Sequence, residues 1–318
     1  MNRKVLVTGG AGFIGSSLVD KLMLLDYRVK VIDNLSTGKK ENIDYHLDKD
    51  SFEFIKADLL KDDISSYFED VEEVWHLAAN PDVKSGLTNT RDMIDQNIIV
   101  TYNVLEAMRK NNVKKINFTS SSVVYGEAKT IPTPENYGPL MPISLYGASK
   151  LASESLISAY ASTFGIKGAI FRLANVVGPR SDHGVIHDFI NKLNKNRNLL
   201  EILGNGNQKK SYVYVEDCVE AMVLASNPQK DIDVFNIGSD DYITVRQIAE
   251  IVSKTMGLQP VFEFGSEDRG WKGDVPVMLL ATDKIKSLGW NLNHNSSESV
   301  KITAEKIISG QGKRSSYQ

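Results

Sequence analysis

Residues 4–15 read KVLVTGGAGFIG, and this stretch decides the fold. The apolar run at its start predicts a buried strand, and leucines at helical spacing predict a helix from Gly15 to Leu25. Gly9 permits a tight turn, Gly12 lets backbone approach a pyrophosphate, and Gly15 lets the helix pack closely on the strand. The amino end of that helix offers free N–H groups and positive partial charge to phosphates. The pattern predicts a dinucleotide-binding strand–loop–helix unit.

An acidic residue follows at the distance that this kind of unit requires. Asp33 ends a second predicted strand, residues 29–33, and lies 33 − 15 = 18 residues past the last glycine. Its carboxylate can accept hydrogen bonds from ribose hydroxyls and would repel a 2′-phosphate, which favours NAD over NADP. Taken alone, the glycine-rich loop leaves an FMN- or ATP-binding loop, or a bare turn, as alternatives.

The first half of the chain alternates short β-branched runs with amphipathic stretches. This alternation predicts an α/β fold of the Rossmann type, a doubly wound parallel sheet covered on both faces. Further strands are predicted at residues 52–55, 74–78, 115–119 and 168–172, with helices at 92–111 and 144–164.

After about residue 175 the rhythm weakens, and Gly, Pro, Asn and charged residues become frequent. A strand at 212–215, a helix at 216–225 and a strand at 233–237 interrupt this part. We therefore predict an NAD-binding Rossmann domain from residues 1–174 and about 211–240. A smaller, interleaved C-terminal substrate domain is predicted from about 175–210 and 241–318.

Bulk properties exclude several classes of function. The net charge is −3, from 37 basic and 40 acidic residues, which leaves no electrostatic footprint for nucleic acid or an anionic membrane. No apolar stretch approaches the length of a membrane span, and no signal peptide is recognised, so a cytoplasmic location is expected. The single cysteine, Cys218, excludes an intrachain disulfide and fits a reducing compartment.

A tyrosine and a lysine four residues apart carry the predicted chemistry. Tyr146 and Lys150 would share one face of the helix predicted at 144–164. A free phenol has a pKa of about 10 and is a poor base, but a neighbouring ammonium favours the phenolate and is expected to lower that pKa. The pair is thus a candidate general base for a sugar hydroxyl. Ser121, in the hydroxyl cluster that ends the fifth strand, would bridge that hydroxyl and the Tyr146 oxygen.

Each of these features has a plainer interpretation. The Tyr–Lys spacing also fits an exposed helix face, and serines at a strand end also cap turn amides. His183 and His187 are four apart, but no third ligand is evident, so no metal is predicted. Cys218 lies on an apolar helix face and is expected to pack as a small hydrophobe.

Taken together, the motifs resemble the extended short-chain dehydrogenase/reductase superfamily and, within it, the NAD-dependent epimerase/dehydratase family. The likeness is to its nucleotide-sugar 4-epimerase branch, typified by the UDP-glucose (UDP-galactose) enzymes, and runs from Lys4 to about Gly289. The motifs are TGGAGFIG at 8–15, DNL at 33–35, ADL at 57–59, HLAA at 76–79, Asn97, SSS at 120–122, VYG at 124–126, YGASK at 146–150 and RLAN at 172–175.

The resemblance implies a set of site residues. It implies catalysis by Tyr146, Lys150 and Ser121. The implied cofactor-binding residues are Gly9, Gly12, Phe13, Ile14, Gly15, Asp33, Asn34, Asp58, Leu59, Leu77, Ala78, Ala79, Asn97, Ser120, Tyr146 and Lys150. The implied substrate-binding residues are Ser121, Tyr146, Asn175, Ile202, Leu203, Lys210, Arg269 and Asp274.

Two of the implied substrate contacts depart from the family pattern. Lys210 stands where the branch commonly has an arginine for the diphosphate, so the charge is kept and the bidentate fork is lost. Arg269, also expected at the diphosphate, is displaced by two positions from its usual place. Asn175 would also contact the diphosphate, Asp274 the ribose, and residues 201–205 the uracil.

The resemblance further implies NAD-dependent epimerisation at C4 of UDP-glucose or UDP-galactose through a 4-keto sugar, by a homodimer. Met278 stands where strict forms carry a bulky tyrosine, which leaves UDP-N-acetylhexosamines open as substrates. Related dehydratases and decarboxylases carry an acid where this chain has SVV at 122–124, which disfavours elimination and decarboxylation. A UDP-glucuronate 4-epimerase, a reductase and a non-catalytic NAD-binding sensor remain alternatives.

Overall fold

In the computed structural model, which describes residues 3–83 and 85–310, seven parallel strands form one central sheet. Their order is β3-β2-β1-β4-β5-β6-β11, so the winding reverses between β1 and β4, where a ligand crevice is expected in such sheets. This confirms the predicted Rossmann class. The strands are β1 (Lys4–Thr8), β2 (Arg28–Asp33), β3 (Phe52–Lys56), β4 (Glu73–His76), β5 (Lys115–Ser121), β6 (Lys167–Leu173) and β11 (Ile232–Ile237).

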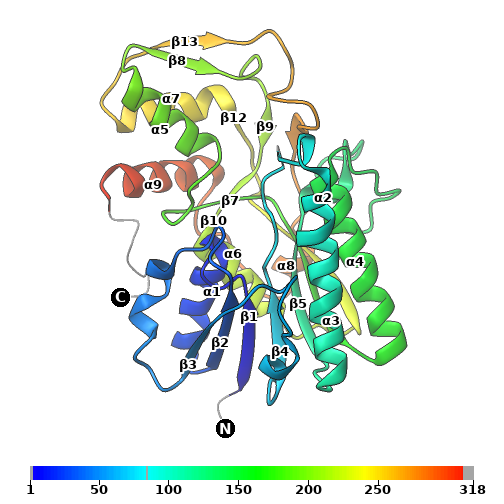
Figure 1. Ribbon diagram of the computed structural model, residues 1–318. Helices are drawn as coiled ribbons and strands as arrows, with labels where there is room; N and C mark the ends of the chain where they lie inside the picture. The colour runs from blue at the N-terminus through cyan, green and yellow to red at the C-terminus, as the bar shows by residue number, and fades with distance from the viewer. Residues whose placement is uncertain (1–2, 84, 311–318) are drawn as a thin grey trace.

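Helices cover both faces of the sheet because alternate strand residues point to opposite sides. Val5 and Val7 pack in the core with α1 (Phe13–Leu24) and α6 (Val215–Leu224), whereas Leu6 packs in the other core with α3 (Val100–Lys110) and α4 (Leu145–Phe164). Figure 1 shows α1 on one side of the sheet and α3 and α4 side by side on the other.

The single helix predicted at residues 92–111 is divided into three parts in the structure. It is built from a short α2 (Thr90–Met93), a π-helical turn η5 (Ile94–Ile99) and α3. The π turn carries one extra residue, and such turns occur often at functional sites.

A second group of elements lies beyond the carboxyl ends of the sheet strands (Figure 1). Its core is formed by α5 (Val185–Lys195), α7 (Val245–Thr255), α9 (Ser296–Ile308) and the paired strands β8 (Leu199–Ile202) and β13 (Val261–Phe264). Its short strands are β9 (Lys209–Lys210), β12 (Ile243–Thr244) and β14 (Val277–Met278), whereas the short helix α8 (Asp283–Lys286) packs against β11 of the large sheet.

The segment 211–240 connects the two groups. β11 forms an edge of the large sheet and α6 packs on α1, but β10 (Tyr212–Tyr214) pairs with β7 (Asn175–Val177) in a separate two-stranded sheet. Part of this segment therefore belongs to the large sheet and part lies between the two groups.

Candidate active site

Glycine is required in the phosphate loop by close backbone approaches. Gly9 has φ +71°, and a Cβ there would lie 2.8 Å from the backbone nitrogen of Ala78. A Cβ on Gly15 would lie 2.0 Å from the carbonyl oxygen of Gly9. The N-cap residue of α1 is Gly12, which has no side chain to cap the helix, and the first turn holds no acidic residue. The loop therefore presents free backbone donors to an anion.

Asp33 lies at the end of β2, next to this loop. Its buried carboxylate accepts hydrogen bonds from the backbone N–H of Ala11 at 3.0 Å and of Leu35 at 2.8 Å. Burial raises the pKa of Asp33, while the two amide donors oppose that change. Each oxygen keeps a lone pair that can accept a hydrogen bond from a ribose hydroxyl, so the residues present fit an adenosine dinucleotide.

The loop and Asp33 form one end of a continuous cleft of about 1230 Å³. A drug-sized ligand needs roughly 300–1,000 Å³, so the cleft has room for a dinucleotide and a second large ligand. The predicted site residues that line it are Gly9, Gly12, Phe13, Ile14, Gly15, Asp33, Asn34, Asp58, Leu59, Leu77, Ala78, Ala79, Ser120, Ser121, Tyr146, Lys150, Asn175, Leu203, Lys210 and Asp274.

Tyr146, Lys150 and Ser121 meet near the middle of the cleft. Ser144 caps α4 by accepting a hydrogen bond from the N–H of Gly147, which places Tyr146 in the first helical turn. Lys150 is buried one turn later, and its Nζ donates to the carbonyl oxygen of Thr119 at 2.8 Å. Ser121 ends β5 and lines the cleft together with Tyr146.

The expected lowering of the tyrosine pKa is wrong for the protein without cofactor. Burial raises the pKa of Tyr146 to about 12, and the hydrogen bond with Ser121 offsets only part of that increase. Lys150 does not counter it, because its Nζ is bound to Thr119 and lies 5.9 Å from the centre of the Tyr146 ring. Burial also lowers the pKa of Lys150 to about 8, while Glu154 acts in the opposite direction.

Glu154 is a buried residue of this region that the sequence analysis missed. It lies one further turn along α4 and forms a bidentate ion pair with Arg172 on β6, with distances of 3.0 and 2.7 Å. Its Oε1 also accepts a hydrogen bond from Ser120 at 2.5 Å. The spacing 146, 150, 154 was a usable signal, since residues four apart share a helix face.

Asn97 does not line the cleft, although it was predicted as a cofactor contact. Its buried side chain accepts from the N–H of Asn80 at 2.8 Å and donates to Ser149 Oγ at 2.8 Å. Its carbonyl, within the π turn, accepts hydrogen bonds from Thr101 and Ser153. Asn97 therefore ties the strand-end segment at Asn80 to α4 from behind the cleft.

At the other end of the cleft, Lys210 forms an ion pair with the buried carboxylate of Asp274. The second oxygen of Asp274 accepts from the N–H of Gly270 at 3.1 Å. Asn175 is half-buried and donates to the carbonyl of Ser211 at 3.1 Å. Two predicted substrate residues, a cation and a carboxylate, are thus brought into direct contact.

Two predicted substrate residues lie elsewhere. Ile202 is the inward residue at the end of β8 and is buried in the core of the second group, whereas Leu203 is exposed at the cleft. Strand alternation explains this difference. Arg269 does not line the cleft, because its guanidinium forms an ion pair with Glu127 at 2.5 Å and donates to the carbonyl of Asp274.

Cys218 and the pair His183 and His187 are the residues set aside in the sequence analysis. Cys218 is fully buried, and burial raises the pKa of its thiol. His183 contacts Asp182 at 2.9 Å. Within residues 3–83 and 85–310, no group of three His, Cys, Asp or Glu side chains is arranged to hold a metal ion. In the same part of the chain, no helix has the length and apolar character of a membrane span.

Comparisons with known proteins identify the family of the chain. The model of the NAD dependent epimerase/dehydratase family matches residues 5–238, so the chain belongs to that family, and NAD is its cofactor. The chain is an enzyme, and it is similar to the UDP-glucose 4-epimerase of Mycolicibacterium smegmatis, with 33% identity over 310 residues, covering 95% of this chain and 97% of that protein.

Solved structures with a similar fold also include nucleotide-sugar epimerases. A UDP-galactose 4-epimerase structure is 42% identical with a TM-score of 0.86, covering 96% of this chain and 99% of that one. A UDP-glucuronic acid 4-epimerase from Bacillus cereus, in complex with UDP-glucuronic acid and NAD, is 30% identical with a TM-score of 0.88 and the same coverage. Solved structures similar to this chain are therefore named as epimerases of different UDP-sugars.

Proposed function

We propose that this enzyme interconverts the C4 epimers of a UDP-hexose, UDP-glucose and UDP-galactose first, with UDP-N-acetylhexosamines as further substrates that Met278 admits. The observation that carries the proposal is the grouping of Ser121, Tyr146 and Lys150 in one cleft with Lys210 and Asp274. The proposed location is the cytoplasm, and the proposed context is galactose metabolism.

The proposed roles follow from the geometry. Tyr146 takes the proton of the sugar 4-hydroxyl, with Ser121 as the relay, and returns it after the sugar has turned. The chemistry that bound NAD supplies is acceptance of the C4 hydride and its return to the opposite face. Bound NAD⁺ would add a positive charge to the site, and positive charge favours the phenolate over the buried phenol.

The substrate must stay bound while its hexose turns. Lys210 supplies positive charge for the diphosphate, and Asn175 supplies an amide donor at the same part of the cleft. Asp274 holds the Lys210 ammonium and keeps lone pairs for ribose hydroxyls. These groups bind the nucleotide, so the 4-keto hexose remains free to rotate before the proton and hydride return.

The segment after Ser121 supports epimerisation over elimination or decarboxylation. Val123 is half-buried and lines the cleft, while Ser122 and Val124 are buried. Residues 122–124 thus offer no carboxyl group to donate or accept a second proton. A reaction that needs only one base and one hydride acceptor fits this surface.

We also propose a homodimer formed through α3 and α4. These helices lie side by side on one face of the sheet (Figure 1) and expose several large apolar side chains. The exposed residues are Tyr102 on α3, Phe164 on α4, and Ile94 and Ile99 on the adjoining η5.

The test is an NMR turnover panel with UDP-galactose, UDP-GlcNAc, UDP-glucuronate and a GDP-sugar, without added reductant. Conversion of UDP-galactose to an equilibrium mixture with UDP-glucose is expected. If UDP-glucuronate is the only sugar converted, the proposed substrate changes from a UDP-hexose to a UDP-uronate, as in the Bacillus cereus relative. Substrate loss without an epimer, turnover only with NADH, or no turnover at all would reject epimerisation.

A further inference from the structure

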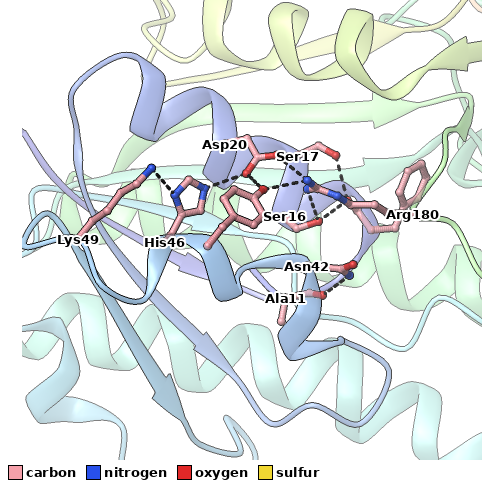
Figure 2. A network of polar contacts seen from close by, with 10 residues as sticks. Ala11, Ser16, Ser17, Asp20, Asn42, His46, Lys49 and Arg180 are labelled. Atoms are coloured by element: carbon pink, nitrogen blue, oxygen red, sulfur yellow. Dashed lines mark hydrogen bonds and ion pairs between the residues drawn. The ribbon is translucent and has the colours of Figure 1, made fainter. Parts of the chain in front are cut away.

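A buried polar network joins α1 to two segments that border the cofactor end of the cleft (Figure 2). We call Ser16, Asp20, Tyr45, His46 and Arg180 the Asp20 network. Ser16 and Asp20 belong to α1, His46 and Tyr45 to the short helix η2 (Asp44–His46), and Arg180 to the segment between β7 and α5. None of these residues is used in the proposed chemistry.

Arg180 supplies the positive charge of this network. Its guanidinium donates to Asp20 Oδ2 and to the Tyr45 hydroxyl, both at 2.8 Å, and to Ser16 Oγ at 3.0 Å. Its side chain is only 4% exposed, and that of Asp20 is 3% exposed. A planar guanidinium that is bonded on several sides holds one position, because its donors have a fixed geometry.

The other carboxylate oxygen of Asp20 is held from the opposite direction (Figure 2). It accepts hydrogen bonds from the Tyr45 hydroxyl and from His46 Nε2, the latter at 2.9 Å. Lys49 Nζ lies 3.1 Å from His46 Nδ1, and an ammonium can only donate, so the hydrogen of a neutral His46 is on Nε2. Asp20 is therefore fully satisfied, and its charge is balanced by Arg180.

The two segments that the network joins both border the cleft. Lys39 and Asn42 line it from one side, and Arg180 lines it from the other. The backbone N–H of Lys39 and the side-chain amide of Asn42 both donate to the carbonyl of Ala11 in the phosphate loop, at 3.0 and 2.9 Å. Lys39 also forms an ion pair with Asp182 at 3.2 Å.

We infer that the Asp20 network retains the bound dinucleotide, with Arg180 and Asp20 as positioning residues. The network fixes α1, the segment around residues 39–46 and the segment around 180–182 in one arrangement beside the phosphate loop. Release of the cofactor requires this end of the cleft to loosen. Retention matters because the electrons taken from the sugar in the first half-reaction must return to the same sugar in the second.

The test measures NAD dissociation from the purified holoenzyme together with the thermal unfolding of the NAD-free protein. Tyr45→Phe keeps the ring and removes one hydrogen-bond donor to Asp20, and Asp20→Asn keeps the shape and removes the charge. We expect NAD to dissociate about tenfold faster from each variant, since each loses a hydrogen bond that involves a charged group. A dissociation rate equal to that of the wild type in both variants would overturn the inference.

The matched control is a partly buried ion pair at the far end of the sheet. Lys115 contacts the buried carboxylate of Glu73 at 3.0 Å, at the amino end of the strands. Lys115→Met should lower the unfolding temperature and leave NAD dissociation within about twofold of wild type. If Lys115→Met releases NAD as fast as Tyr45→Phe does, retention only follows general stability and the inference fails.

An exposed pair at the same place gives a second comparison. Asp182→Asn removes the partner of Lys39, and both side chains are about half exposed. We expect less than a twofold effect on NAD dissociation, because surface ion pairs contribute little. A larger effect than that of Asp20→Asn would assign retention to the surface pair instead. The assay contains no sugar, so it stands whether or not the proposed substrate is correct.

Discussion

At the scale of single residues, environment decides chemistry more than spacing does. The spacing of Tyr146 and Lys150 predicted a tyrosine with a lowered pKa, but burial raises that pKa to about 12 and lowers the pKa of Lys150 to about 8. The residue types were readable from the sequence. Their desolvation was not, because it depends on what packs over them.

Tyr146→Phe should reduce epimerisation at least roughly 100-fold, the usual contribution of a positioned acid–base group, with NAD still bound. Tyr160→Phe is the matched control. It removes a phenol from the same helix whose partner is Glu106, at 2.7 Å, and should leave turnover within about twofold. Turnover and bound NAD are measured on the same preparations, and an active Tyr146→Phe enzyme would exclude Tyr146 as the base.

Lys150 makes stability depend on pH in a predictable direction. Between its folded pKa of about 8 and the ordinary value of 10.5, the unfolded chain holds a proton that the folded chain has lost. Stability therefore rises with pH across this window. Relative to Lys150→Met, the wild type should gain roughly 3 kcal/mol of unfolding free energy from pH 7.5 to 10.5.

Urea unfolding of both NAD-free proteins at several pH values measures this difference. The unfolding free energy of each protein is plotted against pH. Loss of the hydrogen bond to Thr119 in Lys150→Met shifts its curve by a constant amount, whereas titration of Lys150 makes the wild-type curve steeper. Parallel curves would show that the Lys150 pKa is not lowered by folding.

At the scale of elements, the glycine loop and the π turn hold backbone groups in positions that their own sequences predict only in part. The motif predicted glycine at positions 9 and 15, and neighbouring backbone atoms leave no room for a Cβ at either position. The π turn was not predicted, since its Asn97 carbonyl is satisfied by the hydroxyls of Thr101 and Ser153, and Ser153 comes from another helix. Local periodicity does not report such a contact.

Gly15→Ala should weaken NAD binding by at least about tenfold and destabilise the fold by about 1–3 kcal/mol, because its Cβ would overlap the Gly9 carbonyl. Gly168→Ala is the control for general damage. Its Cβ would lie 1.6 Å from the carbonyl of Ile116, at the amino end of the sheet strands. Calorimetric titration should show weakened NAD binding only for Gly15→Ala; equal weakening in both would assign the effect to lost stability.

At the scale of the whole molecule, the apolar face of α3 and α4 predicts self-association. Tyr102 is 45% exposed on this face. Tyr102→Glu would bury a charge in the proposed interface and should convert a dimer to a monomer of 35.3 kDa. Tyr242, which is 44% exposed in the loop before β12, is the matched position, and Tyr242→Glu should remain dimeric. Light scattering after gel filtration measures the mass of each variant in solution. A monomeric wild type would contradict the proposed homodimer.

The sequence by itself determined the Rossmann class, the NAD cofactor and a set of site residues, most of which line the cleft. The class and the cofactor follow from short-range patterns, namely the alternation of strands and helices and the glycines at a turn, whereas most of the site residues follow from the resemblance to the family. Tertiary structure decided what those patterns do not contain. It placed Ile202 in a core and turned Arg269 to Glu127. It also joined Arg180 to Asp20, residues 160 positions apart in the chain. The physical reason is that burial, ion pairing and pKa depend on neighbours in space, which the fold supplies from distant parts of the chain.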